Sequence, residues 1–303
     1  MDQSLRLPAE VTIREVGPMD GLQAERPLAV EDRVRFVDAV SRTGVRKIEA
    51  VSFVSPRAVP AMAEPAEVWA RIDRADGVAY SALVPNRRGA EAAAEAGGFA
   101  SLQGFLAASD GYNARNLGKP VEESVADVRD VLEVGADAGI PVEVTVSAAF
   151  GDPYEGRVEP AAVLDLVGRI LDAGATGISL GDTAGAATPS AVWDLLGRFF
   201  DRFDSVPLNL HFHDTRGTAV ANVLAAMQRG ATEFDASAGG LGGSPFAPDA
   251  GGNVPTEDLA WLLEDMGVRT GVDLAAAMEA AGLAGELVGH PVPGHLLTAG
   301  PTR

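Results

Sequence analysis

Residues 160–183 read PAAVLDLVGRILDAGATGISLGDT and contain one complete helix–turn–strand unit. The spacing of apolar residues predicts a helix over 160–173 that ends at Gly174, because glycine readily adopts the left-handed conformation that follows many helices. The short run over 177–180 predicts a strand, and the polar residues Asp182 and Thr183 follow it at once. This order of elements indicates a parallel sheet built from repeated βα units.

The same unit recurs along the chain, with Gly44 and Gly230 ending other predicted helices. We expect strands at 11–16, 47–51, 78–83, 101–107, 142–148, 177–180, 208–212 and 233–236. Helices are expected at 30–43, 65–72, 89–96, 121–138, 160–173, 190–203 and 217–229. The spacing favours a closed (β/α)8 TIM barrel over a doubly wound sheet, and no glycine-rich dinucleotide motif follows the first strand. We predict one TIM-barrel domain over 1–303, with extra C-terminal helices at 256–266 and 272–281 outside the barrel.

The composition excludes several classes of protein. The formal charge of −19 argues against nucleic acid and anionic membranes as partners, because phosphate binding needs clustered Lys and Arg. The chain has no cysteine, which excludes disulfides, zinc–thiolate sites, iron–sulfur clusters and cysteine nucleophiles. No run approaches the ~18 apolar residues of a membrane span, and the N-terminus has no apolar signal core. A cytoplasmic enzyme is therefore the expectation.

Polar residues collect where the predicted strands end. In a TIM barrel the chemistry lies at these carboxyl ends, in the loops that lead from strand to helix. The glycine-rich segment 239–253 follows the last strand and could close over a ligand, although glycines also suit a permissive surface loop. The other polar residues at strand ends are Glu15, Asp20, Glu49, Ser52, Asp182, Thr183, His211, His213 and Asp214.

His211 and His213 form the strongest local signal. Residues two apart in a strand share a face, so both imidazoles can point into the barrel mouth. Together with carboxylate and amide oxygens they would make a site suited to Mg, Mn, Co or Zn. The alternative is a pair of ordinary polar residues at a strand end, but only four histidines exist in the chain. We therefore favour metal ligands. Asp20 and Asn253, taken alone, fit ordinary turns equally well.

Seven motifs in order make the chain resemble the 3-hydroxy-3-methylglutaryl-CoA lyase family, within the barrel metallolyases. The resemblance covers nearly the whole chain. The motifs are Glu15-Val-Gly-Pro-x-Asp20-Gly-Leu-Gln23, Ile48-Glu49-Ala-Val-Ser-Phe-Val-Ser-Pro56, Gly151-x-Pro-Tyr-Glu-Gly156, Ser179-Leu-Gly-Asp182-Thr183, His211-x-His213-Asp214-Thr215, Gly240-Leu-Gly-Gly-x-Pro245 and Gly252-Asn253 with Thr256-Glu-Asp-Leu beyond it.

The resemblance implies a set of roles. It makes Asp20, His211, His213 and Asn253 the ligands of a divalent metal, with Mg or Mn favoured and Co or Zn as alternatives. It implies a retro-Claisen cleavage of a 3-hydroxyacyl-CoA to acetyl-CoA and a ketoacid, so the expected partner is a small acyl-CoA substrate. Homo-oligomerisation is expected only from the habit of the family. The remaining implied residues are Glu15, Glu49, Asp182 and Ser244 for catalysis and Met19, Gln23, Ser52, Thr183 and Arg216 for substrate binding.

Two positions depart from the family pattern. Met19 stands where the family has an arginine that stabilises the enolate oxygen, and Ser244 stands where it has a cysteine. Loss of one such donor typically costs ~10²–10³ in rate. Asp152 also replaces a cysteine found in many relatives, and is either a surface turn residue or a substituted proton donor.

Three explanations for Met19 remain open. Arg216 could supply the cation, the substrate could need no arginine there, or Met19 could have been introduced to trap a complex. Arg14 is expected to be a poor substitute, because it neighbours Glu15 in a strand and should point to the opposite face. The function classes are accordingly a hydroxymethylglutaryl-CoA-type lyase, a related metal aldolase or Claisen enzyme on another substrate, and a metal-binding protein that has lost catalysis.

Overall fold

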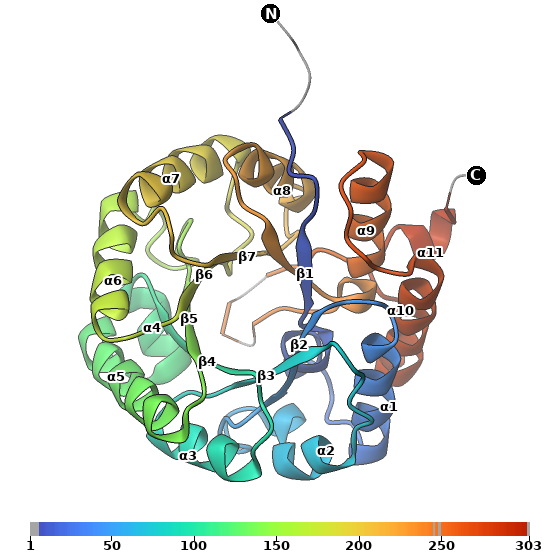
Figure 1. The fold of residues 1–303 in the computed structure, drawn as a ribbon, viewed down its shortest axis with the longest axis horizontal. Coiled ribbons are helices and arrows are strands. Elements are labelled where there is room, and N and C mark those ends of the chain that lie inside the picture. The colour runs from blue at the N-terminus through green and yellow to red at the C-terminus, as the bar shows by residue number, and fades with distance from the viewer. Residues whose placement is uncertain (1–5, 245, 248–249, 302–303) are drawn as a thin grey trace, which may run out of the picture.

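The computed structural model describes residues 6–244, 246–247 and 250–301. Eight parallel strands of these residues close into a barrel in which each strand pairs with its neighbour in sequence and β8 pairs with β1 (Figure 1). The predicted TIM barrel is confirmed. The strands are β1 (Thr12–Glu15), β2 (Lys47–Ser52), β3 (Ala79–Leu83), β4 (Ser101–Ala107), β5 (Val142–Ser147), β6 (Gly177–Asp182), β7 (Leu208–Phe212) and β8 (Glu233–Ala236).

Helices form a ring around the barrel (Figure 1). In the ring are α1 (Val30–Ser41), α2 (Pro65–Arg71), α3 (Arg87–Ala96), α5 (Val121–Ala138), α6 (Pro160–Asp172), α7 (Pro189–Arg202) and α8 (Ala219–Gln228), while the short α4 (Asp110–Leu117), between β4 and α5 in sequence, lies on the inner side of α5 and α6. The predicted bounds are correct to within two residues, and α4 was not predicted. Short turns at η1 (Gly17–Gly21), η2 (Pro60–Met62) and η3 (Ala238–Gly240) lie in loops.

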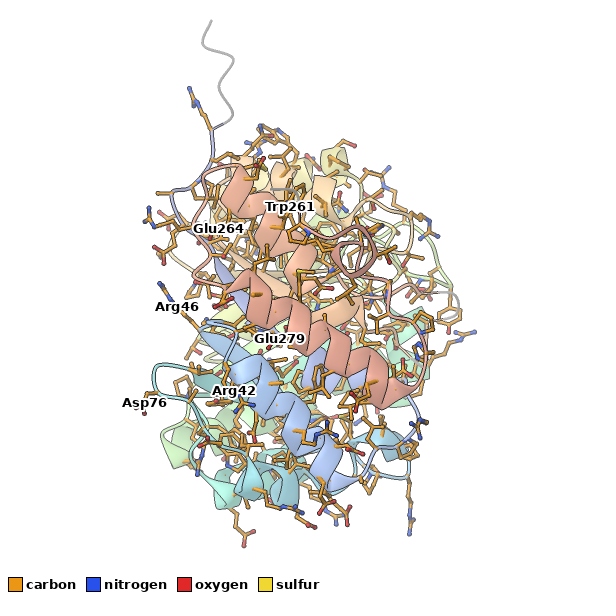
Figure 2. The ribbon with its side chains drawn as sticks, turned by 90° about the vertical axis from the view of Figure 1, so that its right-hand side faces the viewer. Arg42, Arg46, Asp76, Trp261, Glu264 and Glu279 are labelled. Atoms are coloured by element: carbon orange, nitrogen blue, oxygen red, sulfur yellow. The ribbon has the colours of Figure 1, made fainter. Side chains whose placement is uncertain are left out.

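The C-terminal helices pack outside the barrel, as expected. They are α9 (Thr256–Asp265), α10 (Leu274–Val288) and α11 (Leu296–Ala299), and α10 continues well beyond its predicted end. Figure 2 shows α10 lying across the molecule between α1 and α9. In the described part of the chain, no helix is long and apolar enough to cross a membrane.

Glycines end several helices where the sequence predicts it. Gly44, Gly174 and Gly230 have φ values of 86°, 108° and 100°, a region that residues other than glycine rarely adopt. Because each of these turns leads directly into the next strand, they fix the short connections that close the barrel. Pro245, which belongs to one of the family motifs, lies outside the described residues.

The barrel has an apolar outer layer and a polar interior. Side chains such as Ile13 and Ile48 are fully buried between strands and helices, which removes their apolar surface from water. Neighbouring positions on the same strands point inward, and Arg14 is paired in register with both Lys47 and Asp235. The interior of the barrel therefore holds charged side chains that must find partners.

Candidate active site

Two histidines face each other at the carboxyl end of β7. His211 Nε2 and His213 Nε2 lie 3.0 Å apart. The second nitrogen of each ring donates elsewhere, His211 Nδ1 to Asp235 Oδ2 at 3.0 Å and His213 Nδ1 to the backbone oxygen of Gly251 at 2.8 Å. These two bonds set the tautomers, so in the neutral rings both Nε2 lone pairs point into the same space.

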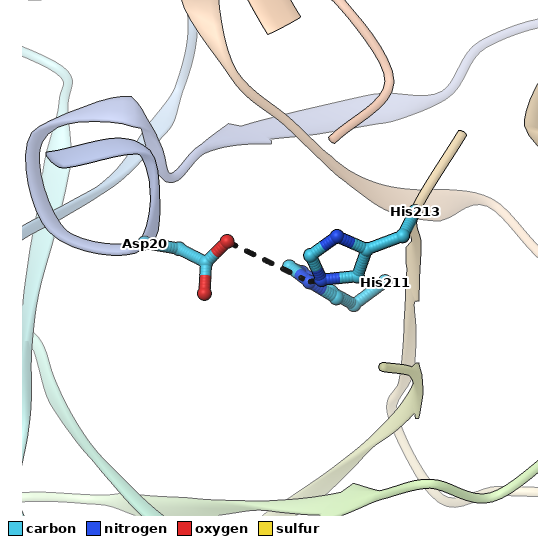
Figure 3. A group of neighbouring side chains, drawn as sticks. All are labelled: Asp20, His211 and His213. Carbon is cyan, nitrogen blue, oxygen red and sulfur yellow. Dashed lines mark hydrogen bonds and ion pairs between the residues drawn. The ribbon is translucent and has the colours of Figure 1, made fainter. Parts of the chain in front are cut away.

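Asp20 faces the two histidines across the barrel mouth (Figure 3). It lies on η1, a short π-helical turn directly after β1, and its Oδ2 atom is 3.9 Å from His211 Nε2. Gln23 Nε2 donates to Asp20 Oδ1, and Asn253 Nδ2 donates to Asp20 Oδ2, both at 2.6 Å. The four predicted ligands therefore come together from the ends of β1, β7 and the loop after β8.

The donor set fits a metal ion. Ligand atoms of Asp20, His211 and His213 all lie within 4.8 Å of one another. Two imidazole lone pairs and a carboxylate repel one another at this distance unless a positive charge lies between them. The buried Oδ1 of Asn253 has no hydrogen-bond partner among the described residues. Two imidazoles with carboxylate and amide oxygens are a set that divalent transition metals and magnesium accept.

The pKa values of the two histidines also indicate a place for one positive charge. Burial lowers the pKa of His211, but the hydrogen bond to Asp235 and the charge of Asp20 outweigh it and raise that pKa to about 9. Burial and the neighbouring His211 lower the pKa of His213. A single positive charge is thus favoured between the rings, which is the place a metal ion would take.

Glu49 is the carboxyl group best placed to exchange a proton. It lines the same pocket as Asp20 and both histidines and is only 5% exposed. Burial raises its pKa to about 8, and the positive charge of Arg14 opposes this shift. A group whose pKa lies near the working pH can both accept and return a proton.

Arg14 occupies the interior of the barrel, contrary to expectation. Its Nε and Nη2 donate to the two oxygens of Asp235 at 2.6 and 2.9 Å, and its Nη1 donates to Glu143 at 3.2 Å. Arg14 lines the pocket, so the prediction that Glu15 faces the site and Arg14 faces away is wrong. The alternation along β1 is as expected, but its phase is the opposite one.

Glu15 is turned away from the pocket and joins three loops. Its Oε1 accepts from the backbone N–H of Gly17 at 2.7 Å and of Ala238 at 3.0 Å, and its Oε2 accepts from Thr256 Oγ1 at 2.7 Å. The geometry gives it a positioning role in place of the predicted catalytic one. It holds the turn that carries Asp20 against the segments after β8.

Asp182 and Ser52 also lie outside the pocket lining. Asp182 accepts from the backbone N–H groups of Ala186 and Ala187 at 2.8 and 3.1 Å, and burial raises its pKa to about 6. It therefore shapes the loop after β6. Ser52 is fully buried, whereas Thr183 does line the pocket.

Arg216 does not take the place of the missing arginine. It is exposed, and its Nη1 donates to the backbone oxygens of Ala184 and Gly185 at 2.8 and 2.9 Å. Met19 itself lines the pocket and is 4% exposed. A thioether has no hydrogen to donate, so this part of the wall is apolar.

Ser244 lies in the pocket lining beside a residue that was not predicted. Tyr112 Oη and Ser244 Oγ are 2.6 Å apart, and Tyr112 belongs to the unpredicted helix α4. Ser109 before this helix and Gly118 after it are start and stop signals that could have revealed it. Arg14 and Asp235 were also missed, although charged residues inside predicted strands were a usable signal.

Asp152 is buried and is therefore not a surface turn residue. It is 4% exposed. Burial favours protonation, but hydrogen bonds from Ser109 Oγ and the backbone N–H groups of Glu155, Tyr154 and Tyr112 outweigh it and lower the pKa. Asp152 therefore stays ionised and ties the loop after β5 to the start of α4.

Comparison with known proteins gives a consistent family. The HMGL-like family model matches residues 10–283. The chain is 43% identical over 287 residues to hydroxymethylglutaryl-CoA lyase YngG of Bacillus subtilis, which covers 94% of this chain and 96% of that protein. It is 41% identical over 277 residues to the 3-hydroxy-3-isohexenylglutaryl-CoA/hydroxy-methylglutaryl-CoA lyase of Pseudomonas aeruginosa, covering 91% and 92% of the two chains.

A solved structure agrees with this. An HMG-CoA lyase from A. baumannii in complex with coenzyme A and 3-methylmalate superposes with a TM-score of 0.93 at 37% identity, covering 97% of this chain and 96% of that one. Fold, sequence and the convergence of motifs point to the same group of proteins. The chain belongs to the HMGL-like family.

Proposed function

We propose that this protein is a divalent-metal-dependent lyase that cleaves a 3-hydroxyacyl-CoA of the hydroxymethylglutaryl type into acetyl-CoA and a ketoacid. Its family and its named relatives make it a carbon–carbon lyase. The observation that carries the metal dependence is the clustering of ligand atoms of Asp20, His211 and His213 within 4.8 Å of one another, with Asn253 hydrogen-bonded to Asp20 beside them.

The residues of the pocket suit the steps of a retro-Claisen cleavage. A bound divalent ion, Mg or Mn, would polarise the substrate hydroxyl and carbonyl oxygens. Glu49 accepts the proton of the tertiary hydroxyl, the carbon–carbon bond breaks, and its electron pair passes to the thioester as an enolate. The enolate then takes up one proton, so that the reaction needs no further reactant.

A related substrate with a larger apolar group is the second candidate. Because Met19 stands where the family has an arginine, this part of the wall has no cation. The other apolar residues of the pocket wall include Val54, Val59, Leu83, Phe105 and Phe246. The relative from P. aeruginosa is named for an isohexenyl substrate as well as for the methyl one. An apolar wall gains free energy when it covers an apolar substituent.

The test is a direct assay. Purified protein is incubated with Mg or Mn and hydroxymethylglutaryl-CoA, and the release of acetoacetate and acetyl-CoA is followed, with 3-hydroxyacyl thioesters carrying larger 3-substituents in parallel. We expect turnover that EDTA abolishes and that added Mg or Mn restores. Metal binding without cleavage of any thioester would instead indicate a protein that has lost catalysis.

The variant Met19→Arg distinguishes between the two candidate substrates. If the methyl substrate is bound as in the family, the new cation should raise kcat on it by about 10-fold or more, because a donor to the enolate oxygen is worth ~10²–10³. Met19→Leu is the matched control, since it keeps the apolar wall. Equal activity of all three proteins on the methyl substrate would show that the pocket has been rebuilt for another one.

A further inference from the structure

Two hydroxyl groups meet in the pocket at the place where the loop after β8 touches α4. Tyr112 Oη and Ser244 Oγ lie 2.6 Å apart and both residues line the pocket that contains Asp20 and the histidines. Ser244 Oγ also accepts from the backbone N–H of Phe246 at 3.2 Å. The short distance is normal for a hydrogen bond between two hydroxyls.

One of the two hydroxyl hydrogens of this pair remains free to donate to a ligand. Two hydroxyls carry two hydrogens, and their mutual bond uses one of them. A phenol is much the stronger acid, so the favoured arrangement has Tyr112 donating to Ser244. Ser244 then accepts two hydrogen bonds, from Tyr112 and from Phe246, which occupy both of its lone pairs. Its own O–H hydrogen is left to point into the pocket, and accepting two bonds strengthens it as a donor.

The position of Tyr112 is set by its surroundings. Its backbone N–H donates to Asp152 Oδ2 at 2.8 Å, and its side chain is 2% exposed in a cluster with Ala107, Ala148 and Ala247. The ring therefore cannot turn freely, and Ser244 is held against a fixed partner although it lies in a glycine-rich loop. A donor fixed in advance loses less free energy to reorganisation when charge develops.

The pocket needs such a donor. Cleavage leaves negative charge on the thioester oxygen, and the side chain at position 19, methionine, cannot donate to it. Arg14 lines the pocket but is engaged by Asp235 and Glu143, and the exposed Arg216 donates to backbone oxygens of the loop after β6. A neutral hydroxyl donor aimed into the site can take over part of what a cation would do.

We propose that Ser244 donates its hydroxyl hydrogen to the thioester enolate oxygen and that Tyr112 is a positioning residue that orients and polarises Ser244. The inference rests on the proposed lyase function, because it requires an enolate. No covalent change of either hydroxyl is involved. The two residues form one unit, in which Tyr112 acts only through Ser244.

A double-mutant cycle tests this. Ser244→Ala, Tyr112→Phe and the double variant are compared with wild type for kcat and KM on the thioester that the wild type cleaves best. We expect kcat to fall ~10²–10³-fold for Ser244→Ala and about 10-fold for Tyr112→Phe, with KM little changed. The double variant should be no slower than Ser244→Ala, and Ser244→Thr, which keeps the hydroxyl, should retain most of the activity.

Tyr154→Phe is the matched control. Tyr154 donates its hydroxyl hydrogen to the backbone oxygen of Phe246 in the same loop, whereas among the described residues Ser244 Oγ bonds to Tyr112 Oη and Phe246 N–H. Its effect should add to that of Ser244→Ala, whereas the effect of Tyr112→Phe should vanish in that background. If Tyr112→Phe instead slows the Ser244→Ala enzyme by its full factor, Tyr112 does not act through Ser244 and the inference is wrong. If the wild type cleaves no thioester, the proposed function fails and the inference fails with it.

Discussion

At the amino end of the barrel interior, Arg14 donates to Asp235 and Glu143, and Lys47 donates to Glu233 at 2.7 Å. At the carboxyl end of the same barrel, the group formed by Asp20, His211, His213 and Asn253 (the upper group) is only partly paired, although Asp20 accepts from Gln23 and Asn253. The histidine Nε2 atoms face each other, and Asn253 Oδ1 has no partner among the described residues.

The difference between these two ends teaches where the chemistry lies. The charged side chains at both ends are buried or half-buried, and burying a charge costs free energy unless a partner compensates it. At the amino end, the network of Arg14, Lys47 and their carboxylates (the lower network) offsets this cost with ion pairs, so it stabilises the fold and leaves Arg14 engaged although it lines the pocket. The upper group leaves part of this cost uncompensated, which is tolerable where a metal or substrate completes the set. Asp235 joins the two ends, because it accepts from both Arg14 and His211.

The largest effect should come from breaking the upper group. His213→Ala removes one of two imidazoles, and we expect Mn binding to weaken and kcat to fall by at least ~10³-fold, since a metal contributes several kcal/mol to such a transition state. Isothermal titration with Mn and the thioester assay measure both. His295→Ala is the control, because His295 is 80% exposed and paired with Asp258. Full Mn affinity in His213→Ala would contradict the assigned ligand set.

An intermediate effect should come from breaking the lower network. Arg14→Met leaves Asp235 buried and Glu143 half-buried without their cation, and removing one partner of a buried pair such as Arg14–Asp235 costs about 3–5 kcal/mol. Denaturant unfolding measures this loss in free energy of unfolding. Arg198→Met removes an exposed pair with Asp194 and should cost only about 0–1 kcal/mol. Equal losses in the two variants would mean that the lower network is not a stabilising one.

The smallest effect should appear in the pH dependence of stability. Because burial holds the pKa of Glu49 at about 8 in the fold, the folded state keeps a proton that the unfolded state releases near pH 4.3. The free energy of unfolding of the metal-free wild type should therefore fall, relative to that of Glu49→Gln, as the pH rises from about 4.3 to about 8. Between pH 6 and 7 the free energy of unfolding of the wild type should fall by about 1.4 kcal/mol more than that of Glu49→Gln. Parallel stability curves for the two proteins would show that Glu49 ionises normally.

The fold and the pairing of the two histidines in the proposed metal site could be predicted from the sequence because both depend on local patterns. The sequence itself shows strands of β-branched residues, helices that end at Gly44 or Gly174, and polar residues at strand ends. His211 and His213 share a face through the two-residue period of a strand. The family motifs added Asp20 and Asn253, which local patterns alone left ambiguous.

Tertiary structure alone decided which face of each strand looks inward. Arg14 and Glu15 are neighbours in β1, and period-two alternation separates them without saying which one enters the barrel; closure against β2 and β8 put Arg14 inside. The bond between Tyr112 and Ser244 joins residues 132 positions apart. No local pattern encodes such a contact, because it depends on how helix α4 and the loop after β8, from distant units of the barrel, meet at one pocket.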